Sequence, residues 1–215
     1  MIRSFVLPMI RKQSHWLFSA ALVPATVSAG SKSVEFPLLP NPAFWNCLSD
    51  GSGEAPSAQV KVTAGKDNDR MVVQLKHIKP GLAFDLFTIE RSNLLPNGSP
   101  DGNFQGFGLA WYQSDVEADS QGNATVQVKT ILLNQIFGFD SSADLAPTNT
   151  FHVGIWFNDP KDAVPCGFDA NNPTPFNGEH RAGPLAMITV PKANTGLGPL
   201  CTKPNKSTFP ATCNP

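Results

Sequence analysis

The feature that most constrains the fold is an alternation of apolar and polar residues that begins at Ala58. In the segments AQVKVTA (58–64) and RMVVQLKHI (70–78), apolar side chains recur at every second residue. A period of two is typical of β-strands with one buried face, whereas an amphipathic helix repeats every 3.6 residues. The intervening GKDND contains Gly, Asp and Asn, which favour turns. These segments therefore predict two antiparallel strands joined by a turn.

Five further segments show strand patterns, separated by turn residues: LAFDLFTIER (82–91), FGLAWYQSDV (107–116), ATVQVKTILL (124–133), NTFHVGIWF (149–157) and LAMITV (185–190). We expect 134–148 to cross the fold with at most one helical turn. Gly and Pro together number 37, and only 15% of residues are charged, which suits a turn-rich β protein rather than a helical bundle. About seven strands predict an all-β, antiparallel two-sheet sandwich with long loops.

Two stretches carry a resemblance to known proteins. VQLKHIKPGLAFDLFTIE (73–90) combines an alternating strand with a Pro-Gly turn, and ADSQGNATVQV (118–128) forms an Asp-x-x-Gly-Asn hairpin pattern. In these features the chain resembles secreted immunoglobulin-like sandwich modules. The resemblance implies an immunoglobulin-like fold and leaves the function open, because function depends on the site rather than the fold.

The first 29 residues have the order of a secretory signal peptide. Basic residues precede the apolar run WLFSAALVPATV (16–27), and the small residues of Val27-Ser28-Ala29 follow it. The run is shorter than the roughly 20 apolar residues that a membrane-spanning helix needs. We therefore predict a signal peptide over 1–29, a secreted or extracellular protein and no membrane span.

The charge balance of the remaining chain excludes one class of partner. Removing 1–29 takes away three of the 16 basic residues and none of the 17 acidic ones, which leaves 13 against 17 and a net charge of −4. Nucleic acids and anionic membranes are bound by clustered Lys and Arg. A mildly acidic chain without a basic stripe predicts no nucleic-acid partner, and small molecules, glycans or extracellular proteins remain as partners.

All four cysteines follow the predicted signal peptide, and an even number in an exported chain indicates two disulfides. Three pairings are possible. We favour Cys47–Cys166, which would tie the N-terminal lead to the body, and Cys201–Cys213, which would close a loop in the tail. A zinc site is disfavoured because no CxxC or CxH spacing is present.

Composition divides the exported chain into three segments. Residues 30–56 are rich in Pro, Ser, Gly and Asn, and their prolines forbid a helix, so we predict an extended lead. Residues 57–191 hold the predicted sandwich. Residues 192–215 form a Gly/Pro-rich tail that we expect to be stapled by its disulfide.

The segment TFHVGIWFNDPKDAVPCG (150–167) contains the densest set of candidate site residues. Alternation places His152 and Trp156 on the face opposite the core, with Gly154 between them. An imidazole and an indole flanking a gap would suit a ligand. The alternative is that another backbone packs into the gap, since Gly inside a strand often marks such an approach.

The loop that follows supplies acid–base and metal candidates. Glu179 and His180 could act with His152 as weak candidates for catalysis by general acid–base chemistry. Asp159, Asp162 and Asp169 are weak candidates for binding calcium, or zinc if a histidine joins them. Because NDPKD lacks the DxDxDG spacing and such residues form ordinary turns, we expect no metal or other cofactor.

The same region superficially resembles the metal loop of copper–zinc superoxide dismutase. That family needs a His-x-His pair on the strand, whereas this chain has Gly154 at the second position. Too few histidines remain in the exported chain to build its metal centre, so we exclude that activity.

Aromatic side chains and sequons complete the set of candidates. Trp111 and the single tyrosine, Tyr112, could stack on a sugar ring or a small hydrophobic ligand, although aromatic residues more often fill cores. Three Asn-x-Ser/Thr sequons predict glycosylation sites in loops, at Asn97, Asn123 and Asn205.

Two functions of different kinds remain open. The first is a secreted binding or structural module with no catalytic set. The second is a secreted sandwich-fold enzyme, such as an isomerase, a cyclase or a dirigent-like stereocontrol protein, that works without a cofactor in an aromatic pocket. We favour the module, because the sequence contains no GxSxG elbow, GxGxxG turn or P-loop. Convergence of the candidates in one cleft would favour the enzyme.

Mass spectrometry of the exported protein tests the predicted processing. After enzymatic removal of N-linked glycans, we expect a mass that corresponds to residues 30–215, lowered by the hydrogens lost in two disulfide bonds and raised by about 1 Da for each asparagine that the enzyme converts to aspartate. Reduction should restore those hydrogens. A mass that includes residues 1–29, or a thiol that reacts with an alkylating agent before reduction, would contradict the prediction.

Overall fold

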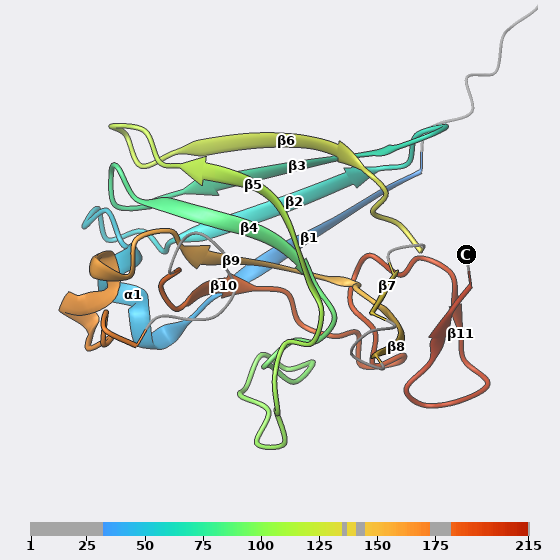
Figure 1. The fold of residues 1–215 in the computed structure, drawn as a ribbon. Helices are drawn as coiled ribbons and strands as arrows, with labels where there is room; N and C mark the ends of the chain where they lie inside the picture. The colour runs from blue at the N-terminus through green and yellow to red at the C-terminus, as the bar shows by residue number, and fades with distance from the viewer. Residues whose placement is uncertain (1–31, 135–136, 141–144, 173–181, 215) are drawn as a thin grey trace, which may run out of the picture. The chain divides into compact units, whose positions relative to one another are not determined.

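The structure is a computed structural model that describes residues 32–134, 137–140, 145–172 and 182–214. Its main feature is an antiparallel sheet built from eight of the strands labelled in Figure 1. These strands are β1 (Ser33–Pro40), β2 (Ser57–Thr63), β3 (Asp69–Lys76), β4 (Ala83–Ile89), β5 (Ala110–Glu117), β6 (Ala124–Thr130), β9 (His152–Phe157) and β10 (Leu185–Ile188).

Within the described residues, the eight strands are hydrogen-bonded in the order β5-β4-β9-β10-β1-β2-β3-β6, and every neighbouring pair is antiparallel. The two edge strands, β5 and β6, also approach each other. The sheet is therefore nearly barrel-shaped, which shields its edges from further pairing.

Strand β1 joins the two halves of this sheet. It pairs with β2 from Ser33 to Leu38 and then with β10 through Leu39 and Pro40. The predicted arrangement of two separate sheets with about seven strands is not confirmed, because β1 belongs to both halves. This strand lies in the proline-rich segment 30–56, whose sequence shows little of the alternation that marks the other strands.

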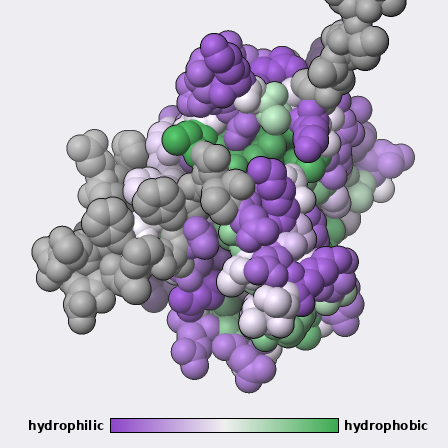
Figure 2. All heavy atoms as spheres, turned by 90° about the vertical axis from the view of Figure 1, so that its right-hand side faces the viewer, coloured by the Kyte–Doolittle hydropathy of each residue, from purple (hydrophilic) through white to green (hydrophobic). Residues whose placement is uncertain are grey.

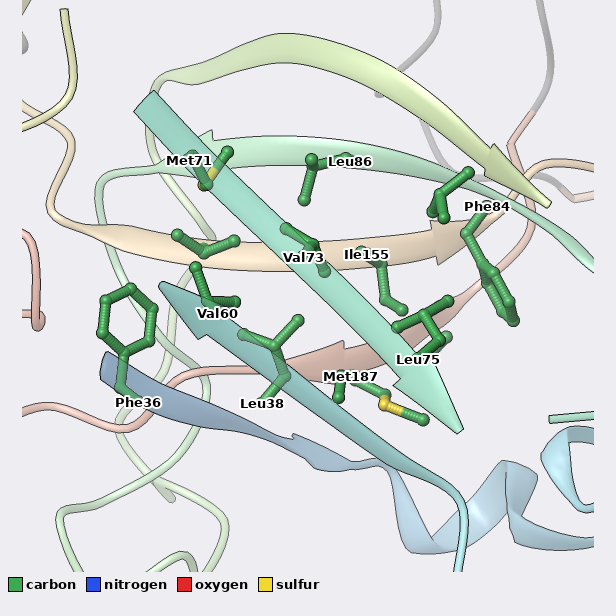
Figure 3. Packing of buried hydrophobic residues seen from close by; sticks show 14 of the residues in the cluster. Phe36, Leu38, Val60, Met71, Val73, Leu75, Phe84, Leu86, Ile155 and Met187 are labelled. Carbon is green, nitrogen blue, oxygen red and sulfur yellow. The ribbon is translucent and has the colours of Figure 1, made fainter. Parts of the chain in front are cut away.

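The core lies between the two halves of the sheet. Alternate residues of β2 and β3, among them Val60, Met71 and Val73, face Leu86 and Ile155 from the other half (Figure 3). The burial pattern of β2 alternates strictly, as its sequence predicts. Each large apolar side chain removed from water in this way contributes about 1.5–3 kcal/mol.

Short helices lie at the left end of the sheet in Figure 1, and one disulfide joins two of them while another closes the tail. The short helices are η1 (Pro42–Phe44), α1 (Trp45–Leu48) and η2 (Pro160–Cys166). The first two lie in the segment 30–56, where no helix was predicted: Pro42 occupies the first turn of η1, a position that tolerates proline, and no proline follows it within α1. The Cys47–Cys166 disulfide joins α1 to η2, and Cys201–Cys213 closes the tail, which contains the short strands β11 (Pro204–Asn205) and β12 (Thr212–Cys213). Both predicted pairings are confirmed.

The segment 134–148 differs from the prediction. It contributes β7 (Phe137–Asp140) and most of β8 (Leu145–Asn149), which form a separate two-stranded sheet. A Cβ atom at Gly138 would lie 2.7 Å from the ring of Trp111, so the glycine allows β7 to pack against that indole. Contact with β5 therefore supports a hairpin whose own sequence lacks clear alternation.

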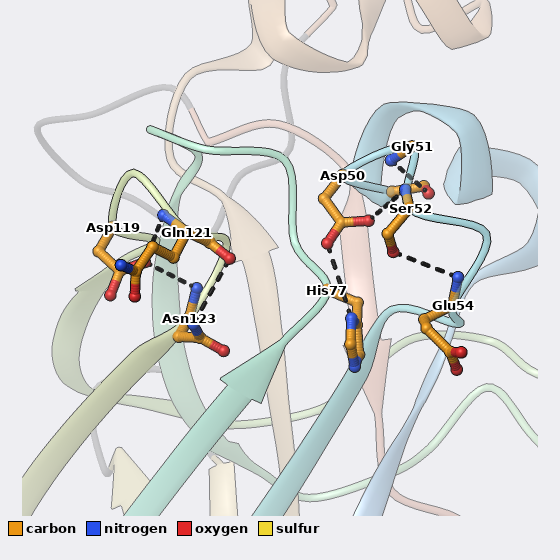
Figure 4. A network of polar contacts seen from close by, with 9 residues as sticks. Asp50, Gly51, Ser52, Glu54, His77, Asp119, Gln121 and Asn123 are labelled. Carbon is orange, nitrogen blue, oxygen red and sulfur yellow. Dashed lines mark hydrogen bonds and ion pairs between the residues drawn. The ribbon is translucent and has the colours of Figure 1, made fainter.

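Polar contacts join the turns at the same end of the strands, next to α1 (Figure 4). Asp50 lies 3.6 Å from the imidazole of His77 and accepts a hydrogen bond from the backbone N–H of Ser52. Hydrogen bonds from the Ser52 side chain and backbone lower the pKa of Asp50. In the neighbouring turn, Asp119 accepts from the N–H groups of Gln121 and Asn123. These aspartates satisfy turn backbones, which is their common role.

The two disulfides should differ in their contribution to stability. Cys47 and Cys166 are separated by 119 residues, whereas Cys201 and Cys213 are separated by 12. Chain-entropy arguments give about 5 kcal/mol for the longer loop and about 3 kcal/mol for the shorter one. We expect the Cys47→Ser/Cys166→Ser variant to lose more free energy of unfolding in urea than Cys201→Ser/Cys213→Ser. Equal losses, or a larger loss for the tail bridge, would contradict this ranking.

Candidate functional site

Strand β9 has a different environment on each face, as its alternation predicts. Val153, Ile155 and Phe157 lie in the main core. On the opposite face, Trp156 belongs to a second hydrophobic cluster with Phe87, Ile89, Ala182, Leu185 and Ile188. Phe107, from the loop between β4 and β5, packs against this cluster. Strand β9 is thus buried on both sides.

The indole of Trp156 fills the gap beside Gly154. A Cβ atom at Gly154 would lie 2.7 Å from the Trp156 ring, so the glycine provides the space that the indole occupies. Phe87 and Phe107 contact the indole edge-on, with ring centroids 5.5 and 5.1 Å away. Trp156 has no exposed surface. In this structure the space between His152 and Trp156 is packed with side chains.

His152 lies at the start of β9 and is 3% exposed. Its Nδ1 is 2.9 Å from the hydroxyl of Thr189, which also accepts a hydrogen bond from the backbone N–H of Val153. Gly198 of the tail packs over the ring, since a Cβ atom there would lie 2.8 Å from Cδ2 of His152. Burial lowers the pKa of His152 to about 4, so the imidazole is neutral near pH 7.

A cleft opens beside His152, which forms part of its buried wall. It consists of two adjoining cavities, of about 360 and 350 Å³, which share Glu90, Arg91, His152, Gly196 and Pro210 in their walls. The loop after β4 supplies one wall, and the tail supplies another. We call this the Arg91 cleft. Each cavity alone has a volume at the lower end of the range of about 300–1,000 Å³ for ligand pockets.

Fixed polar groups surround the Arg91 cleft. Glu90 accepts a hydrogen bond from the N–H of Leu109 at 3.3 Å and pairs with Arg91 at the same distance. Gly108 has a φ of +71° and packs directly against the Glu90 carboxylate, where a Cβ atom would collide with it. The side chain of Arg91 is 56% exposed. The cleft therefore presents a positive group whose neighbouring carboxylate is held by the backbone.

The loop wall adds amides, a carboxylate and an aromatic ring. Asp101, Asn103, Phe104 and Gln105 all line the larger cavity. Asp101 accepts a hydrogen bond from the N–H of Asn103 at 2.9 Å, which shapes the turn. The ring of Phe104 lies 4.7 Å from that of Phe107, and Phe107 in turn rests on Trp156. The loop wall of the cleft is thus packed, through Phe104 and Phe107, against the buried aromatic cluster.

Trp111 and Tyr112 lie apart from the cleft, on the edge strand β5, and are 44% and 55% exposed. A β-bulge opposite Leu86 and Phe87 shifts the register next to Tyr112. The hydroxyl of Tyr112 donates to Asp115 at 2.8 Å. Burial, followed by this hydrogen bond, raises the pKa of Tyr112 to about 12. The structure therefore does not bring this predicted ligand-binding pair together with His152.

The predicted acidic candidates have local structural roles. Asp159 accepts from the N–H of Lys161 at the start of η2, and Asp169 accepts from the N–H of Asn171. Burial raises the pKa of Asp162. Among the residues that the structure describes, no group of three His, Cys, Asp or Glu side chains could hold a metal ion. Glu179 and His180 lie outside the described residues.

The three predicted glycosylation sites are exposed: Asn97, Asn123 and Asn205. The side chain of Asn97 accepts from the N–H and hydroxyl of Ser99, and that of Asn205 accepts from the N–H of Ser207. Asn97 and Asn123 lie in turns, and Asn205 is the last residue of β11, directly before a turn.

Sequence reasoning missed Glu90, Arg91, Asp101, Asn103 and Gln105, which line the cleft. A signal was present in IER (89–91), where a charged pair directly follows a buried strand. A second signal was the length of the 92–109 connection, because long loops in compact domains are often functional.

Comparison with known proteins gave no match: no family model, no curated protein and no solved structure is significantly similar to the chain. The site is therefore interpreted from its own geometry.

Burial of His152 should make stability depend on pH. In the unfolded chain its pKa returns to about 6.5, so between pH 6.5 and 4 only the unfolded state takes up this proton. Stability from the neutral imidazole is complete above pH 6.5 and is lost as the pH falls to 4, by about 3 kcal/mol. Urea unfolding at pH 7 and pH 4 measures this loss.

Between pH 7 and pH 4, the free energy of unfolding of the His152→Gln variant should fall by about 3 kcal/mol less than that of the wild type. This difference holds whatever the stability of the variant at pH 7. Gln74→Ala, at an exposed position of β3 that carries no ionisable group, is the matched control and should keep the wild-type loss. Equal pH dependence in the wild type and His152→Gln would show that burial of this imidazole is not the cause.

Proposed function

We propose that the chain is a secreted binding module that holds a small polar ligand, of the size of a saccharide, in the Arg91 cleft. The observation that carries this proposal is the composition of the cleft wall. Glu90, Arg91 and His152 come from two neighbouring strand ends, while the facing walls come from the 92–105 loop and the tail. Three distant parts of the sequence thus meet around one cavity.

The chemistry of the lining favours a polyhydroxylated ligand. Each sugar hydroxyl both donates and accepts hydrogen bonds, and Arg91, Asn103 and Gln105 offer donors beside the acceptors of Glu90 and Asp101. The ring of Phe104 offers a flat apolar surface for the C–H face of a sugar. A guanidinium would also pair with a ligand carboxylate, so uronic acids belong to the same class.

Secretion remains part of the proposal and has indirect support. Two disulfides are typical of proteins that fold in oxidising compartments. Among the described residues, no helix is long and apolar enough to cross a membrane. The immunoglobulin-like classification also remains a proposal, supported by the antiparallel strands and the two packed halves of the sheet.

The alternative of an acid–base enzyme has weaker support. His152 lines the cleft, yet burial holds its pKa near 4, and a general base works best with a pKa close to the operating pH. Its Nδ1 is already engaged by Thr189. A binding role requires no change in this arrangement and is therefore favoured.

The binding proposal is tested by NMR titration of the ¹⁵N-labelled protein with a panel of neutral and uronic-acid mono- and disaccharides. We expect shift changes confined to residues 90–105, 151–152 and 191–213. Arg91→Ala and Phe104→Ala should weaken binding at least tenfold, because each removes about 1.5 kcal/mol or more of contact energy.

Arg70→Ala is the matched control, since Arg70 lies on β3 and bonds Gln127 on β6. Its affinity should equal that of the wild type. Absence of binding across the panel, or binding that neither cleft variant weakens, would disprove a saccharide site in this cleft.

A further inference from the structure

A separate cavity, of about 510 Å³, lies beside β1 and shares only Pro191 with the walls of the Arg91 cleft. We call it the β1 groove. Its walls are largely apolar and include Val34, Phe36, Pro37, Val190, Pro191 and Pro199. Figure 2 views the molecule from the side where the tail lies and shows hydrophobic surface exposed among hydrophilic residues.

The β1 groove opens where β1 changes partners. Strand β10 pairs with β1 only at Leu39 and Pro40. Beyond β10 the chain stays next to β9, because the N–H of Thr189 donates to the carbonyl of Val153. From Ser33 to Leu38, β1 is paired with β2 on one side only. The sheet thus has an internal gap, with β1 on one wall and residues 189–193 on the other.

The hydrogen-bond alternation of β1 shows which backbone groups face this gap. Ala64 donates to the carbonyl of Lys32, and Asn41 donates to the carbonyl of Ala186. In antiparallel pairs, hydrogen-bonded positions alternate along the strand. Even-numbered residues of β1 therefore bond to β2, and odd-numbered residues face β10 or, from 33 to 37, the gap. The N–H and C=O of Glu35 and the C=O of Pro37 point into the β1 groove.

Among the described residues, no hydrogen bond is made to these groove-facing groups of Glu35 and Pro37. A row of such groups at a strand edge is a template for pairing with another extended chain. Consecutive N–H and C=O groups spaced along a strand are matched by a polypeptide backbone and not by an acyl chain or a sugar. The backbone chemistry of the groove thus indicates a peptide.

Charges at the β1 groove indicate the character of that peptide. The Glu35 carboxylate is already paired with Lys61. The ammonium of Lys192 donates to the carbonyls of Pro199 and Cys201, and no carboxylate pairs with it among the described residues. A lysine ammonium has three donors, so one remains for a ligand carboxylate. The groove therefore favours an acidic peptide over a basic one.

We propose that the β1 groove binds an extended, acidic segment of another protein, which adds as a strand antiparallel to β1 between β1 and residues 189–193. The strand would continue the line of β10 and occupy about six residues along Ser33 to Leu38, at about 3.3 Å per residue. Alternate side chains would enter the apolar groove, while the backbone bonds the groups of Glu35 and Pro37. This site is independent of the ligand proposed for the Arg91 cleft.

In the first experiment, phage that display random linear heptapeptides are selected for binding to the disulfide-bonded protein. The enriched sequence is then synthesised, and its affinity is measured by isothermal titration calorimetry. We expect enriched sequences with apolar residues at alternate positions and more acidic than basic residues. N-methylation of the synthetic peptide at one set of alternate residues should weaken binding at least tenfold, while N-methylation at the other set should have little effect.

A matched pair of variants tests the groove-facing backbone. Glu35→Pro removes the N–H that points into the groove without removing a bond to β2, whereas Glu35→Ala keeps that N–H. We expect at least a tenfold loss of peptide affinity for Glu35→Pro and wild-type or higher affinity for Glu35→Ala. Arg91→Ala should bind the peptide as the wild type does, which separates this site from the cleft.

Several outcomes would overturn the proposal. These are a lack of enriched peptides, equal affinity in the two Glu35 variants, or an N-methylation profile without alternation. Since N-methylation acts on the peptide, that result stands even if Glu35→Pro fails to fold. Binding of dodecanoate by Glu35→Pro and wild type alike, with no enriched peptide, would assign the groove to an acyl chain. A wild-type dimer in sedimentation that Glu35→Pro dissociates would assign it to a second copy of the chain.

Discussion

The change of partner along β1 is the constraint on which the rest of the structure depends. Because β1 bonds β2 with its first residues and β10 with its last, it holds the two halves of the sheet face to face. The main core fills the space between these halves. The same change of partner leaves one side of residues 33–37 without a strand, which opens the β1 groove. Core and groove are thus consequences of a single feature of the backbone.

The two proposed sites illustrate different uses of the same scaffold. The Arg91 cleft is formed by loops and the tail at the ends of β4 and β9, where side chains of varied chemistry meet. The β1 groove is formed within the sheet, and its backbone groups carry much of its chemistry. Long loops rest on the aromatic cluster around Trp156, so the cleft has a rigid base although most of its polar groups belong to a loop.

Much of the strand pattern could be predicted, and the failures have physical causes. Strict alternation predicted β2, β3 and β6, and it placed Val153 and Trp156 of β9 on opposite faces. Strand β1 was missed because its prolines break the pattern and only its neighbours impose pairing. Strands β7 and β8 were missed because contact between Gly138 and Trp111 supports that hairpin. The cleft residues were missed because a loop sequence does not reveal which strand ends it will approach.

The sequence by itself determined most strands of the main sheet and limited the disulfides to three pairings, of which the structure has the favoured one. Alternation and turn chemistry act over a few residues, and four cysteines allow only three ways of forming two disulfides. The tertiary structure alone decided the closure of the sheet and the surroundings of His152 and Trp156. Alternation predicts which face a side chain occupies, whereas the Trp156 indole beside Gly154 and the Gly198 backbone over His152 arise from the packing of distant segments. Such packing depends on the volumes of side chains far apart in the sequence, which no local pattern encodes.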